Sequence, residues 1–329
     1  MKDWIEPNGI FIINIPIEWQ YVNTVMSGGV EESPYSFEPY DNDLGCFQIS
    51  CYPLTKQGVN PNFPIQKNNS KIEWFRKRMD DNEFNMHLYY AQVDDQFCMA
   101  KYIYSKNHNS DIRIKQELEN VDKALDKFRL IPQEDRLLAA NLKKHDNFIG
   151  SLIASHDLLE RAYENESHIE LVVILANQID AFLRSAIILH KQLSFKTNDI
   201  EIKYIFQGEG EKGIAERQIY SIAKELNIID EKIYNDLNHL YDQRNKVIHR
   251  YIISFLKTRD ILELAYDYTM IKEKIRVILQ QYEEMQFGKG FGIYGRRFSK
   301  ENIFNEQDYK RANSLINDKH LIEKLKKKL

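Results

Sequence analysis

One stretch constrains this chain more than any other: residues 170–193 are apolar almost all the way round a helical projection. A helix of this kind has no polar face to turn toward water, so it must be buried among other elements. It therefore predicts a helical bundle with this segment at its centre. Asn177, Asp180 and Arg184 interrupt the apolar pattern, and their spacing by three and four places them on one face of the helix.

Helical periodicity predicts the other members of the bundle on both sides of this segment. A boundary is predicted at residues 131–135, because Pro132 ends one pattern and the acidic pair after it suits the first turn of the next helix. Residues 131–287 are therefore expected to form an all-α bundle. Its predicted helices are 134–165, 170–193, 213–226, 230–251 and 257–285, with a short helix at 198–206.

Residues 1–130 follow a different pattern, with short β-branched and alternating runs typical of strands. They predict an α+β domain in which helices pack on an antiparallel sheet. Strands are expected at 10–15, 35–40 and 45–52, and a hairpin at 87–93 and 96–104 turns at Asp94 and Asp95. Residues 57–69 have the composition of a loop, and helices are predicted at 71–80 and 111–130.

Composition excludes several classes of protein. Hydrophobic residues make up 43% of the 329 and charged residues 29%, which is typical of soluble globular proteins. No apolar run reaches the length of a membrane span, and the N-terminus lacks the pattern of a secretory signal, so a cytoplasmic protein is expected. Cys46, Cys51 and Cys98 lack metal-ligand spacing and are interpreted as reduced thiols, so neither metal nor cofactor is predicted.

The net charge of −4 conceals a gradient along the chain. Residues 1–130 hold 14 Lys and Arg against 19 Asp and Glu, whereas residues 286–329 hold 11 against 5. The positive charge is therefore local to the C-terminal end, which argues against one nucleic-acid-binding surface over the whole chain. The 19 Tyr and 17 Phe supply aromatic cores and leave some rings for stacking on bases.

The end of the predicted helix 230–251 carries a candidate catalytic motif, Arg244-Asn245-Lys246-Val247-Ile248-His249-Arg250-Tyr251. Asn245 and His249 are four residues apart and lie about 40° from each other on a helix. Arg244 and His249 are five apart and diverge, so only the length of the Arg side chain or a second copy of the helix brings both to one phosphate. A permanent guanidinium and a titrating imidazole suit phosphodiester cleavage. The plain alternative is a helix end with a solubilising Arg and a His near the C-terminal dipole.

This octapeptide resembles the signature of the HEPN superfamily, in which an Arg, often followed by Asn, precedes a His by four to six residues. Arg244, Asn245 and His249 match that signature, and Tyr251 matches the longer form found in HEPN toxins paired with nucleotidyltransferase antitoxins. The resemblance implies a metal-independent endoribonuclease that acts on RNA as a homodimer, in a toxin, stress or anti-phage role. It also implies a regulatory site at Tyr251, against the alternative that this ring only packs on the end of the bundle.

Two interpretations of Asp180 and Arg184 stay open. They form an ordinary helical ion pair, or they line the groove that faces Arg244 and His249, since HEPN domains carry a polar or acidic residue on the corresponding core helix. A second class of function also stays open, because many HEPN-like bundles are non-catalytic modules that bind RNA, nucleotides or proteins.

The remaining segments carry weaker signals. Residues 1–130 resemble the PsbP-like fold, through an opening strand that runs into Pro16-Ile17-Glu18-Trp19 and a closing helix through Asp122 and Phe128. Residues 288–295 contain the spacing of a dinucleotide fingerprint without the strand and helix that it needs, so they are interpreted as a mobile or ligand-contacting loop. That loop opens a third segment, 288–329, which ends in a basic helical tail.

Overall fold

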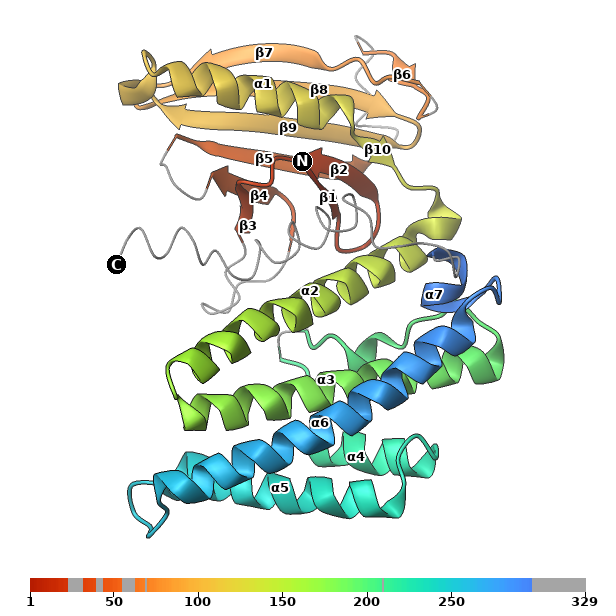
Figure 1. The fold of residues 1–329 in the computed structure, drawn as a ribbon. Helices are drawn as coiled ribbons and strands as arrows, with labels where there is room; N and C mark the ends of the chain where they lie inside the picture. The colour runs from red at the N-terminus through yellow and green to blue at the C-terminus, as the bar shows by residue number, and fades with distance from the viewer. Residues whose placement is uncertain (23–31, 40–43, 55–62, 69, 209, 298–329) are drawn as a thin grey trace. The chain divides into compact units, whose positions relative to one another are not determined.

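A computed structural model describes residues 1–22, 32–39, 44–54, 63–68, 70–208 and 210–297. The described chain forms a sheet-rich N-terminal region and a helical C-terminal half (Figure 1). It divides into two compact units, one comprising Met1–Lys143 and the other beginning at Lys144. The division falls within one long helix, α2 (Arg136–Glu164), which follows the loop where the sequence predicts a boundary. Each unit is described by itself.

The sheet unit contains two sheets. The smaller one has the order β1 (Lys2–Ile5), β2 (Phe11–Ile15), β10 (Arg129–Leu130). The larger one has the order β3 (Trp19–Val22), β4 (Tyr35–Pro39), β5 (Cys46–Pro53), β9 (Gln96–Ser105), β8 (Phe84–Val93), β6 (Ile65–Gln66), and β7 (Phe75–Asp80) also pairs with β8. The pairing is antiparallel except between β6 and β8.

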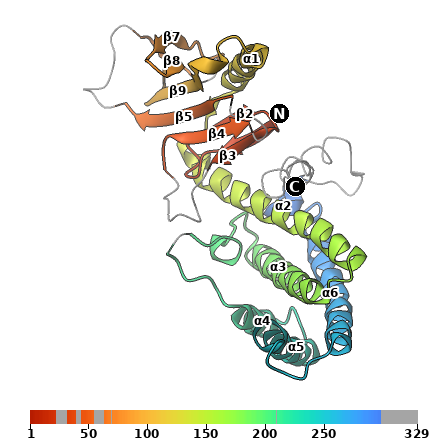
Figure 2. The ribbon, with the colours of Figure 1, turned by 90° about the vertical axis from the view of Figure 1, so that its left-hand side faces the viewer.

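The core of this unit is aromatic. Strand alternation turns Phe37, Phe47 and Tyr102 inward, and all three are fully buried. Helix α1 (Ile112–Asp126) packs against one face of the sheet, as Figure 1 and Figure 2 both show. Glu117 of that helix accepts a hydrogen bond of 2.7 Å from the indole nitrogen of Trp19. The predicted hairpin is present as β8 and β9, with Asp94 in the left-handed conformation at the turn (φ 47°).

One sequence prediction in this unit is wrong. Residues 71–80 were expected to form a helix, but residues 75–80 are strand β7 in register with β8. Phe75 and Met79 are four residues apart and so share a face in a strand as well as in a helix. A short isolated helix is marginal in water, whereas the backbone groups of β8 offer a formed partner for a strand. The predicted helix at 111–130 also ends earlier, at Asp126, and Arg129–Leu130 join β2 as β10.

The helical unit is built around α3 (His168–Phe195), which contacts the other helices that follow it, and Figure 2 shows α3 beside α6. Those helices are α4 (Glu216–Glu225), α5 (Glu231–Arg250), α6 (Thr258–Gln286) and α7 (Gly292–Arg297). Helix α2 joins them through side chains. The amide of Gln178 on α3 donates to the hydroxyl of Ser155 at 3.0 Å, and the hydroxyls of Tyr163 and Thr269 lie 3.2 Å apart.

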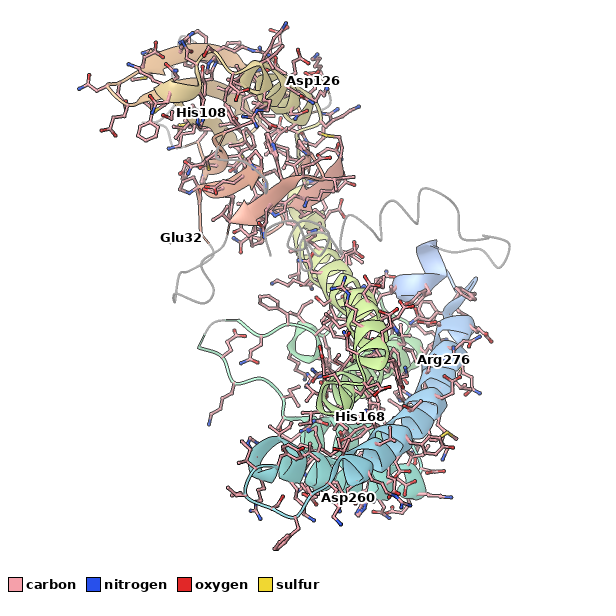
Figure 3. All side chains as sticks on the ribbon, turned by 60° about the vertical axis from the view of Figure 1, so that its left-hand side comes forward. Glu32, His108, Asp126, His168, Asp260 and Arg276 are labelled. Carbon is pink, nitrogen blue, oxygen red and sulfur yellow. The ribbon has the colours of Figure 1, made fainter. Side chains whose placement is uncertain are left out.

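Helix α3 is the buried centre that the sequence predicts. By length and composition it is the one described helix that would qualify to cross a membrane, with a mean hydropathy of 1.7, yet 72% of that apolar window is buried inside the protein. Such burial is that of a core helix, because the apolar side chains already have partners. In Figure 3, His168 marks the first residue of α3, and Asp260 and Arg276 mark α6.

Two predictions on the connecting segments are corrected by the structure. The short helix expected at 198–206 is only a 3₁₀ turn, Ile202–Tyr204. Residues 288–295 were predicted to be a mobile or ligand-contacting loop, but α7 begins at Gly292 and its first amides donate to Asn198, Gln192 and Gln286. A Cβ on Gly292 would lie 2.6 Å from the Gln286 side chain, so the glycine permits this close approach. The predicted basic tail lies outside the described residues.

Candidate functional site

The residues of the motif lie on α5, and the helix period decides which of them face inward. Asp230 caps the helix by accepting a hydrogen bond from the amide of Ile233 at 2.7 Å. Leu237, Leu240 and Val247 are buried. Arg244 falls between them at spacings of four and three, so its side chain starts from the core-facing stripe of the helix. His249 lies about 140° further round and is exposed.

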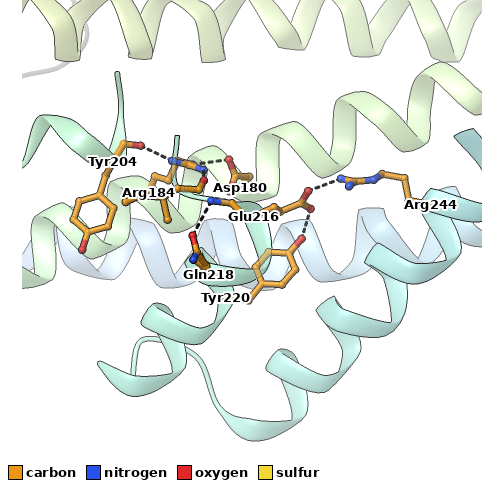
Figure 4. A network of polar contacts seen from close by, with 9 residues as sticks. Asp180, Arg184, Tyr204, Glu216, Gln218, Tyr220 and Arg244 are labelled. Carbon is orange, nitrogen blue, oxygen red and sulfur yellow. Dashed lines mark hydrogen bonds and ion pairs between the residues drawn. The ribbon is translucent and has the colours of Figure 1, made fainter. Parts of the chain in front are cut away.

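The guanidinium of Arg244 is bound by Glu216, the first residue of α4. Its Nη1 lies 2.6 Å from Oε2 of Glu216, and the two side chains are only 13% and 17% exposed. The hydroxyl of Tyr220, one turn further along α4, donates to the other oxygen of the same carboxylate (Figure 4). A helix N-terminus suits the carboxylate, because its free amides carry partial positive charge.

The other sides of the guanidinium are also occupied. It lies over the ring of Tyr241 at 4.7 Å from the centroid, a cation–π arrangement. Its Nη2 donates to Oδ1 of Asn245 at 3.4 Å, so the Arg and Asn of the motif do meet. Within the described residues, Nε of Arg244 and the buried hydroxyl of Tyr268 have no hydrogen-bond partner.

Burial and the Glu216 carboxylate shift the pKa values of Arg244 and Tyr220. Burial lowers the pKa of Arg244, because it disfavours the charged form. The nearby Glu216 carboxylate raises the pKa by more, so that the pKa of Arg244 lies above its usual value. Burial and the same carboxylate raise the pKa of Tyr220. Arg244 is therefore a permanent, immobilised cation, and Tyr220 stays a neutral donor to Glu216.

Asp180 and Arg184 form a second ion pair on α3. Nε of Arg184 lies 2.6 Å from Oδ2 of Asp180. The remaining guanidinium nitrogens donate to the backbone oxygens of Tyr204 and Ile214 at 2.9 and 2.7 Å (Figure 4). Arg184 therefore fixes both ends of the segment that leads from Tyr204 to the start of α4. Burial raises the pKa of Asp180, against the opposing effect of Arg184, and Glu216 and Arg244 also act on it through space. Asp180 thus lies close to the Arg244 network but is bonded to Arg184.

His249 and Tyr251 lie elsewhere, in an apolar crevice of about 550 Å³ at the end of α5. Its wall includes Ile169 and Val173 from α3. The segment after the helix is strongly exposed: Ile252 is 94% exposed, Ile253 81% and Phe255 100%. Tyr251 is 38% exposed. In one chain, therefore, His249 lies on an apolar surface, whereas Arg244 points into the separate polar network with Glu216 and Tyr220.

This arrangement defines what one chain can do chemically. It offers an exposed imidazole that can transfer protons and a guanidinium whose position is set by a carboxylate and an aromatic ring. Across the described ranges, no group of three or more His, Cys, Asp or Glu side chains could hold a metal ion. Bringing Arg244 and His249 to a single phosphate requires a second copy or a rearrangement of the Arg244 side chain.

Sequence reasoning missed Glu216, Tyr220, Tyr241 and Tyr268. Only Tyr241 carried a usable signal, because it precedes Arg244 by three residues on the same helix. Glu216 is 28 residues away and reads as an ordinary acidic residue in a first helical turn. Its role depends on how α4 packs against α5, which no local pattern reports.

No family model matches the chain, and no curated protein matches it. Among solved structures, a crystal structure from Bacteroides thetaiotaomicron VPI-5482 is similar over 55% of this chain and 76% of the other, at 12% sequence identity and a TM-score of 0.30. A similarity of that size carries no argument about fold or function.

Proposed function

We propose that the helical unit is a HEPN-like, metal-independent endoribonuclease that acts as a homodimer in the cytoplasm. The observation that supports it is the environment of His249: an exposed imidazole at the end of α5, set in an apolar crevice and five residues after an immobilised Arg244. An exposed imidazole contributes little to packing, whereas proton transfer requires that the imidazole be accessible to solvent and substrate.

In the proposed reaction, the 2′-hydroxyl of one nucleotide attacks the adjacent phosphorus. The bond from phosphorus to the 5′-oxygen breaks, which leaves a 2′,3′-cyclic phosphate and a free 5′-hydroxyl. His249 accepts the proton of the 2′-hydroxyl, and the second His249 of the dimer gives a proton to the departing oxygen. Arg244 stabilises the charge on the phosphorus oxygens, and Asn245 orients the guanidinium to which it is bonded.

The second copy is proposed for a geometric and an energetic reason. Arg244 and His249 of one chain diverge, so a composite site needs two α5 helices. Ile252 and Ile253, which line the crevice with His249, are 94% and 81% exposed, and Phe255 just after them is 100% exposed. Exposed apolar surface of this kind marks an interface. Burying it between two chains would bring both copies of His249 into one cleft.

We expect the purified protein to scatter light with a mass of twice 39.1 kDa at micromolar concentration. Replacing Ile252 and Ile253 with Asp places two charges in the proposed interface, so the mass should fall to that of one chain. Phe195→Asp is the matched control, because Phe195 is 74% exposed at the far end of α3 and should leave the dimer intact. A monomeric wild-type protein would contradict the composite site.

We also expect Tyr251 to accept AMP from a nucleotidyltransferase antitoxin. Its ring is 38% exposed in the crevice beside His249, and the added bulk and negative charge would repel RNA phosphate there. Intact-mass measurement after co-expression should show one added AMP on the wild type and none on Tyr251→Phe. Tyr266→Phe, at 64% exposure on α6, is the control and should still be modified. Absence of any modified form would make Tyr251 a packing residue.

A second function has its own support. Arg244 is held by Glu216 and stacked on Tyr241, as a purely structural arginine would be. That favours a non-catalytic module that binds RNA, a nucleotide or a protein.

One experiment separates the two functions. Wild-type protein is incubated with a mixed RNA pool in the presence of EDTA, and the product ends are analysed by mass spectrometry. The nuclease predicts cyclic phosphate ends and no cleavage of the same sequences as DNA, which lacks the 2′-hydroxyl. Intact RNA from every pool would leave the binding module as the function.

A further inference from the structure

The large sheet of the N-terminal unit has one face turned away from its core. The register of β5, β9, β8 and β7 is unbroken, so alternate residues of all four strands share a face. Tyr102 and Ala100 point to the buried face, on which α1 lies; Asp126 in Figure 3 marks the end of that helix. On the opposite face Phe75 and Met79 are 48% and 44% exposed, whereas Ser50, Leu88 and Gln92 are buried.

Aromatic rings form a continuous row on this open face. Phe75 and Tyr90 are directly opposite each other on β7 and β8, with ring centroids 6.5 Å apart. Tyr90 and Phe97 of β9 follow at 6.1 Å, with ring planes inclined by only 19°. Phe63 supports the outer edge at 4.7 Å from Phe75. Each ring is therefore held by a neighbour while part of its surface remains accessible.

Two lysines lie beside the aromatic row. Lys77 on β7 and Lys101 on β9 are both opposite Leu88 of β8, which lies two residues from Tyr90. On the described part of these four strands, no Asp or Glu points to the open face; Glu38 on the neighbouring strand β4 interacts with Cys46 of β5. Among the described acidic residues, Glu117, Glu119, Asp122 and Asp126 belong to α1, on the other face of the sheet.

We propose that this open face, formed by β5, β9, β8 and β7, binds single-stranded nucleic acid. Bases stack on exposed rings whatever their sequence, and lysines beside the rings meet the phosphates. A duplex hides its bases, so a flat aromatic row selects unpaired strands. Two lysines with no opposing carboxylate favour a polyanion over a protein segment. The proposal does not rest on the cleavage reaction of the helical unit.

The test measures fluorescence anisotropy of labelled 2′-O-methyl RNA and DNA strands of about 12 nucleotides with the full-length protein. Neither probe has a free 2′-hydroxyl, so the result is independent of nuclease activity. We expect the wild type to bind both strands with a Kd of about 1–100 µM and to bind a duplex of the same length more weakly.

Variants locate the contact. Tyr90→Thr with Phe97→Thr should weaken binding at least about 10-fold, whereas Tyr90→Phe keeps the ring and the affinity. The aromatic control, Phe195→Thr on α3, should bind like the wild type. Lys77→Ala with Lys101→Ala should lower the slope of log affinity against log salt by about 1.4, at 0.7 per phosphate contact. Lys115→Ala with Lys123→Ala, both exposed on α1, is the matched charge control.

Thermal unfolding of each variant shows whether the fold is retained, and the lysine pair tests the face even if the threonine variant is unstable. The proposal is overturned if the wild type binds no strand at about 100 µM, if it binds duplex as tightly as single strands, or if the face variants and the control variants bind alike. The first of these results would rule out nucleic acid as the ligand of this face.

Discussion

Replacing His249 with alanine is expected to lower RNA cleavage by at least about 100-fold, since proton transfer by a positioned side chain contributes roughly 10²–10⁴. The free energy of unfolding should change by less than about 0.5 kcal/mol, because the side chain is exposed and caps no buried group. Loss of activity without loss of stability is the signature of a group that acts on substrate. Initial rates on a labelled RNA, with urea unfolding of the same preparations, measure both quantities.

The matched control is His239→Ala. His239 is exposed on the same helix, ten residues before His249, and lies outside the crevice. It should retain full activity. If the two variants cleave RNA at equal rates, His249 is not the proton-transfer group and the composite site is wrong, whatever the oligomeric state.

The second large effect concerns Glu216. Glu216→Ala leaves the Arg244 guanidinium enclosed and unpaired, so we expect a loss of about 3 kcal/mol in the free energy of unfolding, at the lower end for broken buried pairs because both side chains keep some solvent access. RNA cleavage should also fall, since the guanidinium loses the anchor that sets its position. Urea unfolding and cleavage rates are again the measurements.

A triple variant separates the two roles of this pair. Glu216→Leu with Arg244→Met and Tyr220→Phe removes both charges and the buried hydroxyl that donates to Glu216, so stability should return close to that of the wild type while cleavage is abolished. Arg259→Ala breaks an ion pair with Glu263 whose side chains are 85% and 62% exposed, and should change stability little. A stable, fully active Glu216→Ala protein would show that the contact neither holds the fold nor positions Arg244.

Long periodic helices were the most predictable part of this structure. The apolar spacing of α2, α3, α5 and α6 places each within a few residues of its observed bounds, because one periodic stripe over many turns has a single helical solution. Short segments were less predictable. Residues 75–80 fit both periods, and only the presence of β8 as a pairing partner made them a strand.

The helical period of residues 230–251 was enough to indicate that Arg244, Asn245, His249 and Tyr251 share one helix end, and that Arg244 and His249 diverge around it. A helix fixes such relations through its period alone. Only the tertiary structure decided that Glu216 and Tyr241 hold Arg244, that apolar side chains surround His249, and that rings from β7, β8 and β9 form one row. Apart from neighbours on α5 itself, such as Tyr241, these contacts join residues of different elements, which helix packing and strand register bring together; no local pattern encodes either.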